Sequence, residues 1–301
     1  MALWLWMAWA LVHPPRMNDG KAIYILKRLS PMDLGLKFQA IRFDVTDHRT
    51  NRPLSLASWW MPAEDNKAQD RCAILVHGYA DAKIGAIAWA PLFHELGYHI
   101  LAIDLRGHGE SEGNATTAGY FEKHDLNQVI DQLLQRYPKQ TRELTLFGIS
   151  MGAAVVAATA VMREDLSAVI LECPYADFRQ AAAAHGMLMG LPLPGLQKCS
   201  IYLAQKLIGA DFGEVRPVDL IPRISCPLMV IQSGKDPLVG PAEMDALQAA
   251  VESRHGALTK YWRIAGAGHV LGMAADPMEY ERRIQSFLAR VKAREDLNKG
   301  Q

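Results

Sequence analysis

The chain has 301 residues, half of them hydrophobic, and its 32 Lys and Arg residues balance its 32 Asp and Glu residues. That is enough apolar sequence to bury one large core, and length alone allows one domain or two. The balanced charge argues against the basic surface that nucleic acid or anionic lipid requires, so we expect a small, largely uncharged molecule as the partner.

Residues 1–12 form an apolar segment that includes Trp4, Trp6 and Trp9. The segment is shorter than the roughly 20 residues that span a bilayer, and it lacks the positive n-region of a signal peptide. Three interpretations remain: the tail of a membrane anchor, an interfacial anchor, or a helix that covers an apolar patch on this or a second subunit. We expect a protein that is either cytoplasmic or associated with a membrane through residues 1–12, and the sequence leaves a homodimer open.

Extended apolar runs dominate the rest of the chain. Residues 38–45 and 54–61 flank a turn-rich stretch and predict an antiparallel hairpin. Six shorter runs follow, at residues 72–76, 99–103, 144–147, 168–171, 228–231 and 261–264. Most are separated by helix-length segments, which predicts an α/β fold with a mostly parallel eight-stranded sheet and helices on both faces. We expect a connector through residue 37, a domain over residues 38–301, and a site at the carboxyl ends of the strands.

Ser150 lies in a Gly-x-Ser-x-Gly motif between an expected strand and an Ala/Val-rich helix. The small residues Gly148 and Gly152 permit a sharp turn that lifts the serine hydroxyl clear of the sheet edge, where it can attack a carbonyl carbon. The same motif occurs around Ser111, but no helix pattern follows there and carboxylates flank the serine. We therefore interpret Ser111 as a loop residue and Ser150 as the nucleophile.

A long interval separates the runs at 168–171 and 228–231, and it is too long for a plain crossover. We interpret residues 174–222 as a small helical cap inserted over the site. Its apolar, Met-rich part predicts an adaptable wall for short to medium acyl chains. The residues expected to line that pocket are Met187, Leu188, Met189, Leu191 and Leu193.

A serine nucleophile needs a base and an acid. His269 is the best placed of ten histidines, because it follows the last expected strand in a glycine-rich loop. His77 and His108 lie in tight turns where a hydrogen-bonding role is expected. Asp236 follows the preceding strand and completes the chain order Ser, Asp, His, with Asp177 among its rivals.

The oxyanion of an acyl-transfer intermediate needs two backbone N–H groups aimed at one point. Met151, at the start of the helix after the nucleophile, is expected to supply one of them. Tyr79, in the loop after the first core strand, is expected to supply the other, because that loop runs beside the turn at Ser150.

Together these motifs resemble the α/β-hydrolase family, over roughly residues 38–290. The resemblance rests on five stretches in the family's order: His77-Gly78-Tyr79, residues 104–111, residues 148–152, Gly234-Lys235-Asp236 and Gly268-His269. Within the family the chain looks most like serine esterases related to the hydrolase domain of acylaminoacyl peptidase and to bacterial membrane-anchored hydrolases.

The motifs predict a serine hydrolase that cleaves carboxylic esters through an acyl-serine intermediate. A serine peptidase or thioesterase of the same fold, or an inactive interaction module, are the alternatives. We expect no cofactor and no metal, because the chain lacks a phosphate loop and the usual zinc-ligand spacings. The four cysteines are expected as free thiols, with a bridge between Cys173 and Cys199 left open for an oxidising compartment.

Overall fold

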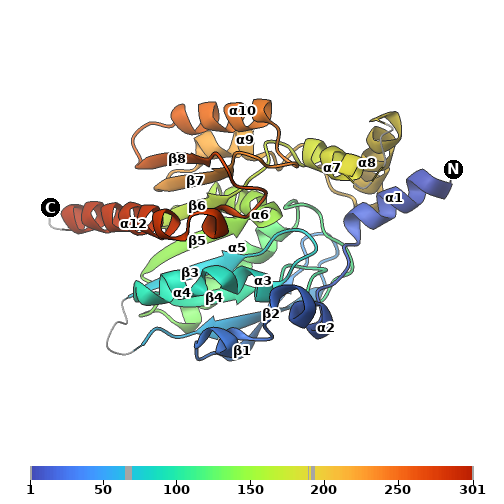
Figure 1. Ribbon diagram of the computed structural model, residues 1–301. Helices are drawn as coiled ribbons and strands as arrows, with labels where there is room; N and C mark the ends of the chain where they lie inside the picture. Colours follow the sequence, from blue (N-terminus) through green and yellow to red (C-terminus); the bar gives the residue numbers. More distant parts are fainter. Residues whose placement is uncertain (1, 65–69, 189, 191–193, 300–301) are drawn as a thin grey trace.

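A single eight-stranded sheet forms the centre of the molecule in the computed structural model, which describes residues 2–64, 70–188, 190 and 194–299 (Figure 1). The strands are β1 (Gln39–Thr46), β2 (Pro53–Met61), β3 (Arg71–Val76), β4 (His99–Ile103), β5 (Glu143–Ile149), β6 (Ala168–Glu172), β7 (Leu228–Ser233) and β8 (Thr259–Ile264). Their spatial order is β1-β2-β4-β3-β5-β6-β7-β8. β2 pairs antiparallel with both β1 and β4, and the remaining pairs are parallel, which confirms the expected α/β fold.

The central strands are buried on both faces, which explains why they appear in the sequence as unbroken apolar runs. In β3, the side chains of Ile74 and Val76 belong to one hydrophobic cluster, and those of Ala73 and Leu75 belong to another. Each cluster is one side of the sheet with the helices that cover it. Because successive strand residues point to opposite faces, both halves of the core depend on every second residue of the same strand.

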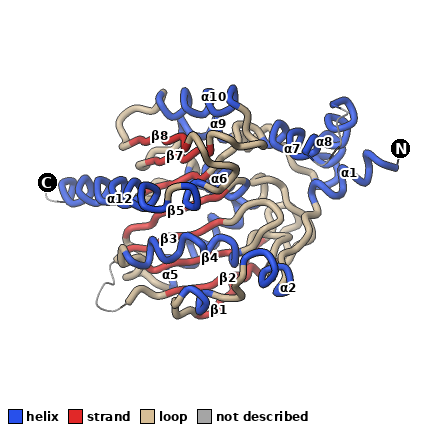
Figure 2. Tube along the Cα trace, viewed as in Figure 1, coloured by secondary structure: helices blue, strands red, loops and turns tan. Residues whose placement is uncertain are grey.

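Helices cover both faces of the sheet (Figure 2). The first cluster includes side chains of α5 (Glu122–Arg136), α6 (Met151–Ala160) and α10 (Pro241–Glu252). The second includes side chains of α3 (Lys83–Ala86), α4 (Ala90–Glu95) and α12 (Pro277–Lys299). The remaining helices are α1 (Ala2–Val12), α2 (Asp19–Lys21), α7 (Phe178–Leu188), α8 (Pro194–Ile208), α9 (Pro217–Leu220) and α11 (Gly272–Ala275), with short helical turns η1 (Ala22–Leu26), η2 (Pro31–Leu34), η3 (Ile87–Trp89) and η4 (Ile221–Arg223).

The N-terminal helix α1 packs along α8, within the stretch expected to form the cap (Figure 1). Ala8 and Val12 are completely buried in this contact, whereas Trp6 and Trp9 are more than half exposed. Residues 1–12 were given three interpretations above. The structure agrees with the third, a helix that covers an apolar patch on its own chain. Within the described ranges, no helix is both long and apolar enough to cross a membrane.

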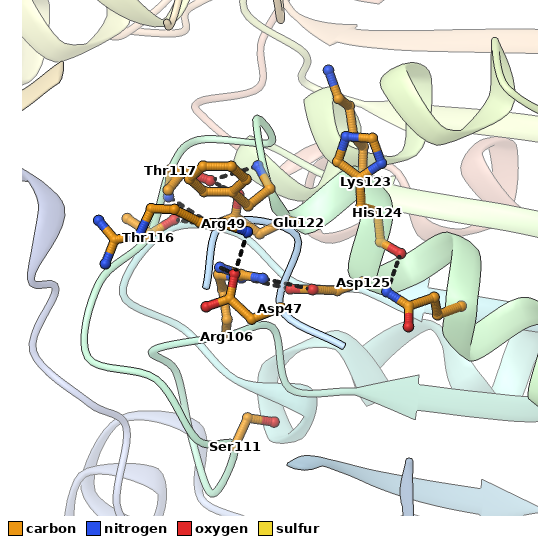
Figure 3. A network of polar contacts seen from close by, with 12 residues as sticks. Asp47, Arg49, Arg106, Ser111, Thr116, Thr117, Glu122, Lys123, His124 and Asp125 are labelled. Atoms are coloured by element: carbon orange, nitrogen blue, oxygen red, sulfur yellow. Dashed lines mark hydrogen bonds and ion pairs between the residues drawn. The ribbon is translucent and has the colours of Figure 1, made fainter. Parts of the chain in front are cut away.

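The loop between β4 and α5 is held by buried charged groups (Figure 3). The guanidinium of Arg106 donates two hydrogen bonds to Asp125, at 2.6 and 2.7 Å, and also approaches Asp47. The buried carboxylate of Glu122 accepts hydrogen bonds from Thr116 and Thr117, at the other end of the loop. Because an unpaired buried charge is costly, these contacts define one conformation of a loop that passes beside the strand ends.

Candidate active site

Ser150 lies at the carboxyl end of β5, in the turn that leads into α6. Its backbone has φ 53° and ψ −115°, a conformation that side-chain-bearing residues seldom adopt. The turn is tight enough that a Cβ on Gly152 would clash with the carbonyl oxygens of Val76 and His77, and a Cβ on Gly148 would lie 2.7 Å from Ala153 Cα. These two positions therefore require glycine, as the motif predicts.

The Ser150 backbone is also tied to the neighbouring strand. Its N–H donates to the carbonyl oxygen of Glu172, the last residue of β6, at 2.8 Å. This bond holds the strained residue against the sheet, so the strain is balanced by the surrounding structure rather than released by a change of backbone conformation.

His269 and Asp236 meet Ser150 at this edge of the sheet. His269 Nε2 lies 2.9 Å from Ser150 Oγ, and His269 Nδ1 lies 2.6 Å from Asp236 Oδ2. Asp236 follows β7 and His269 follows β8, so three loops that are far apart in the sequence converge on one point. The other oxygen of Asp236 accepts hydrogen bonds from the backbone N–H groups of Leu238 and Val239, at 2.8 and 3.2 Å.

These contacts assign the protons on the imidazole ring. A carboxylate oxygen can only accept a hydrogen bond, so the proton of a neutral His269 ring lies on Nδ1, facing Asp236. Nε2 then has a free lone pair directed at the hydroxyl of Ser150. The arrangement can take a proton from Ser150, and Asp236 can stabilise the positive charge that the ring gains.

Two backbone N–H groups predicted for the oxyanion belong to segments next to Ser150. Met151 is the first residue of α6, where N–H groups lack acceptors within the helix. The loop with Tyr79 also runs beside the nucleophile, because a Cβ on Gly78 would lie 3.3 Å from Ser150 Cβ. Both residues line the cavity at Ser150.

The alternative residues have other partners. Ser111 is buried, donates to the carbonyl oxygen of Asp104 at 2.6 Å and accepts from the N–H of Ala57 at 2.8 Å, so it links the loop to β2. Figure 3 shows Ser111 in this loop, apart from the charged network. Asp177 forms ion pairs with Arg179 and Arg216.

His77 and His108 have the hydrogen-bonding roles expected of them. His77 Nε2 accepts from the N–H of Leu105 at 3.0 Å, and His108 Nδ1 lies 2.9 Å from the carbonyl oxygen of Arg106. Burial lowers the pKa of His77 well below its usual value, and burial likewise lowers the pKa of His108. Both rings are therefore neutral parts of the loop structure at neutral pH.

A small apolar cavity of about 70 Å³ opens at Ser150 and His269. Its wall on the α7 side is formed by Phe178, Ala181, Ala182 and His185, near the start and middle of the helix. The cavity is therefore a hydrocarbon-lined space directly beside the serine hydroxyl.

The predicted pocket residues do not form this wall. Met187 and Leu188 are 61% and 58% exposed, because they lie at the end of α7, beyond the part that faces Ser150. The prediction for these two side chains is corrected accordingly. Met189, Leu191 and Leu193 lie outside the described residues.

A buried carboxyl group lies behind the candidate triad, at the end of β6. The hydroxyl of Tyr280 donates to Glu172 Oε2 at 2.8 Å and accepts from Trp89 Nε1 at 2.8 Å. Burial raises the pKa of Glu172 to about 8, against the opposing effect of the Tyr280 hydrogen bond. Glu172 is therefore protonated at neutral pH. The backbone carbonyl group of the same residue accepts the hydrogen bond from Ser150 that holds the turn.

Cys173 follows Glu172 and also faces the site. Its sulfur lies 3.2 Å from Ser233 Oγ and accepts from the N–H of Val270 at 3.4 Å. Potential metal-ligand atoms of Cys173, Asp236 and His269 lie within 4.8 Å of one another. Asp236 and His269 are already bonded to each other, and burial raises the pKa of the Cys173 thiol, so the thiol acts as packing behind the acid–base pair. All four cysteines are free in the structure.

Part of the chain resembles a known protein family, and its fold resembles those of solved structures. Residues 67–208 match the family model described as "Serine aminopeptidase, S33". The structure of the Pyrococcus furiosus esterase Pf2001 superposes with a TM-score of 0.72 at 23% identity, covering 93% of this chain and 98% of that chain. The chain has the α/β-hydrolase fold. The order of its strands and the sequence of strand, sharp turn and helix at Ser150 belong to that fold.

Other proteins that this chain is similar to differ from it in length. The uncharacterized protein YqkD of Bacillus subtilis is 29% identical over 219 residues, which cover 71% of this chain and 70% of YqkD. The lysophosphatidylserine lipase ABHD12 of Macaca fascicularis is 27% identical over 210 residues, and the match spans 48% of that lipase. The Pyrococcus horikoshii acylaminoacyl peptidase has a TM-score of 0.61 at 16% identity, and the superposition covers 44% of its chain. The comparisons indicate a hydrolase.

Several residues at the candidate site could not be predicted from the sequence. Leu11 lines the cavity at Ser150 although the two residues are 139 positions apart in the sequence, and no local sequence pattern predicts that contact. His185 also lines the cavity, although no motif surrounds it in the sequence. Leu238 and Val239 could have been found, since they follow Asp236 directly in the same turn.

Proposed function

We propose that this protein is a carboxylic ester hydrolase that acts through an acyl-Ser150 intermediate. The observation that carries the proposal is the hydrogen-bonded series from Ser150 Oγ through His269 to Asp236, with separations of 2.9 and 2.6 Å. Those distances are within the reach that proton transfer between a nucleophile and its base requires.

In the first half of the reaction, Ser150 Oγ attacks the ester carbonyl carbon while His269 Nε2 takes the hydroxyl proton. The negative charge moves to the carbonyl oxygen, where the N–H groups of Met151 and Tyr79 are proposed to receive it. Collapse of the tetrahedral intermediate breaks the bond to the alcohol, which leaves with the proton from His269. Water then attacks the acyl group by the same route, releasing the carboxylic acid and restoring Ser150.

The lining of the cavity favours an uncharged ester over the free amino terminus of a peptide. An aminopeptidase must hold a positively charged amine, and that requires a carboxylate directed into the substrate pocket. Among the described residues that line the cavity at Ser150, none is acidic. The cavity instead offers apolar groups such as Phe178, Ala181 and Val239, which suit the acyl part of an ester. The Pyrococcus furiosus protein Pf2001, which has the same fold, is described as an esterase, and this supports the choice of an ester.

A substrate panel tests the proposal. Hydrolysis of p-nitrophenyl esters with acyl chains from short to long should be measured beside acyl thioesters and aminoacyl p-nitroanilides. We expect the oxygen esters of short to medium acyl chains to give the highest kcat/KM. Thioester or anilide turnover that exceeded ester turnover would instead support a thioesterase or peptidase of the same fold.

The role of Ser150 is tested with Ser150→Ala and a fluorophosphonate probe. We expect labelling of the wild-type protein at Ser150, and a fall in kcat on the order of 10⁴ to 10⁶ for Ser150→Ala. The matched control is Ser111→Ala, which removes the other serine in a Gly-x-Ser-x-Gly motif and should keep both labelling and turnover. A wild-type protein that is well folded and yet neither labelled nor active would show that the chain is an inactive interaction module.

A further inference from the structure

A second apolar cavity, of about 180 Å³, lies outside the cavity at Ser150. The two cavities share Leu11, Tyr79, Ala182 and His185 as lining residues. Since one set of side chains borders both spaces, the two cavities are neighbours, and the cavity at Ser150 is the inner one. The outer cavity is lined by residues of α1, α7 and α8, and these three helices lie together at one end of the molecule (Figure 1).

We propose that α1 forms one wall of an acyl channel, and that this helix sets the acyl chain length that the enzyme prefers. The inference rests on the proposed ester hydrolysis and names the part of the protein that selects among esters. Its occupant is the hydrocarbon chain of the acyl group bound to Ser150. The residues that α1 contributes to the wall are Trp6, Met7, Ala10 and Leu11.

The spacing of these residues fits a continuous wall. Leu11 borders both cavities, and Met7 lies four positions earlier, one turn away on the same face of the helix. Trp6 is 60% exposed and marks the outer end of the channel. From Leu11 to Trp6 the helix rises by about 7.5 Å, at 1.5 Å per residue, so an acyl chain that extends outward from Ser150 follows α1 for more than one turn.

The helix is held in place by polar contacts as well as by packing. The hydroxyl of Tyr79 donates to the carbonyl oxygen of Ala10 at 3.1 Å, and the N–H of Thr116 donates to that of Val12 at 2.8 Å. Just after the helix, the guanidinium of Arg16 donates to the carbonyl oxygens of Gly109 and Ser111 at 2.8 and 2.7 Å. Because α1 is attached to the loops around the site, its side chains face the channel in a defined position.

Tyr79 belongs both to the proposed channel wall and to the proposed oxyanion site. Its backbone N–H is the proposed oxyanion donor, its ring lines both cavities, and its hydroxyl holds α1. An acyl chain that packs against α1 therefore contacts the same residue that is proposed to stabilise the transition state. Binding energy from the chain can then contribute to the positioning of the ester carbonyl.

Two substitutions on α1 should move the preferred chain length in opposite directions. Ala10→Phe fills the outer part of the channel, so the maximum of kcat/KM across the p-nitrophenyl ester series should shift to shorter acyl chains. Met7→Ala widens the channel, so the maximum should shift to longer chains. Each methylene that loses its contact with the wall costs about fourfold in kcat/KM, the equivalent of ~0.8 kcal/mol, so a chain that loses four contacts should lose on the order of 10²-fold.

The control is Leu5→Phe, which enlarges an exposed side chain on the same helix without entering either cavity. We expect it to keep the wild-type profile. A misfolded variant would lose activity on every ester alike, whereas the proposal requires a shift of the maximum, and Met7→Ala requires a gain on long chains. Profiles that coincide with the wild type for both Ala10→Phe and Met7→Ala would overturn the channel while leaving ester hydrolysis in place.

Binding of free fatty acids separates the channel from the reaction. In a Ser150→Ala background, calorimetric titration with fatty acids from butyrate to dodecanoate should show affinity that rises with chain length, and Ala10→Phe should remove that rise. If this dependence is present while the wild-type protein hydrolyses no ester, the channel stands and the proposed reaction is wrong. Affinity that is independent of chain length, and equal with and without Ala10→Phe, would contradict the channel whatever the enzyme hydrolyses.

Discussion

The buried carboxyl group of Glu172 makes the stability of this protein depend on pH. Glu172 is completely buried, and its pKa in the folded protein is raised from 4.5 to about 8 by burial, whereas an exposed carboxyl in the unfolded chain titrates near 4.5. Replacement by Gln keeps the size and the contact with Tyr280 but removes the titration. The difference in unfolding free energy between the wild-type protein and Glu172→Gln, measured against pH, therefore reports the proton that Glu172 holds in the folded state.

The sign and size of the effect follow from linkage. Between the two pKa values the folded protein holds one proton more than the unfolded chain, so stability is highest below about pH 4.5 and falls as pH rises toward 8. One proton corresponds to a slope of ~1.4 kcal/mol per pH unit. Relative to Glu172→Gln, the wild-type protein should then lose about 3 kcal/mol of unfolding free energy between roughly pH 5.5 and 7.5.

Urea unfolding followed by tryptophan fluorescence, at several pH values between those limits, measures this difference by linear extrapolation. The control is Glu279→Gln, which removes a partly exposed carboxylate whose pKa is lowered to about 2 by hydrogen bonds from Arg282 and then Arg283. That group stays ionised across the range, so its replacement should shift stability by the same amount at each pH. Parallel curves for wild type and Glu172→Gln would refute the conclusion that Glu172 is protonated in the folded protein.

Three further substitutions test the site and its surroundings. Asp236→Asn should lower kcat for ester hydrolysis by on the order of 10³ to 10⁴, because the carboxylate that orients His269 is lost. If Asp177→Asn lowered kcat far more than Asp236→Asn, the acid role would belong to Asp177. Ser150→Gly should unfold with a free energy about 1 kcal/mol higher than Ser150→Ala, since glycine accepts the positive φ at this position, and equal stability in urea would contradict strain there. Asp125→Ala should cost about 3–5 kcal/mol of unfolding free energy, because it leaves Arg106 buried without its bidentate partner, and a loss below 1 kcal/mol would contradict that pairing.

Much of the fold could be predicted because its signals are local. The run at 72–76 predicted β3 (Arg71–Val76) within one residue, since a strand buried on both faces has no polar positions to interrupt it. The motif around Ser150 was equally local, because a turn this tight tolerates only small residues at 148 and 152. The distinction between Ser150 and Ser111 also rested on neighbouring residues, and the two serines have different partners in the structure.

The walls of the site could not be predicted in the same way. Met187 and Leu188 were expected to line the pocket because they are apolar and close together, but hydrophobic composition does not say which side of a helix faces the core. That depends on how α7 lies over the sheet, and the part that faces Ser150 is an earlier turn with Phe178 and Ala181. Apolar residues left exposed at a helix end are common on protein surfaces.

The sequence by itself determined the order of strands and helices, the turn at Ser150, and the loops that carry Asp236 and His269, because each is encoded by neighbouring residues. Only the tertiary structure decided that α1 packs on α8, that Leu11 reaches the cavity at Ser150, and that Glu172 lies in a buried position with Tyr280. The physical reason is that these contacts join segments more than a hundred residues apart, and their energy comes from surfaces that become neighbours only after the sheet has formed.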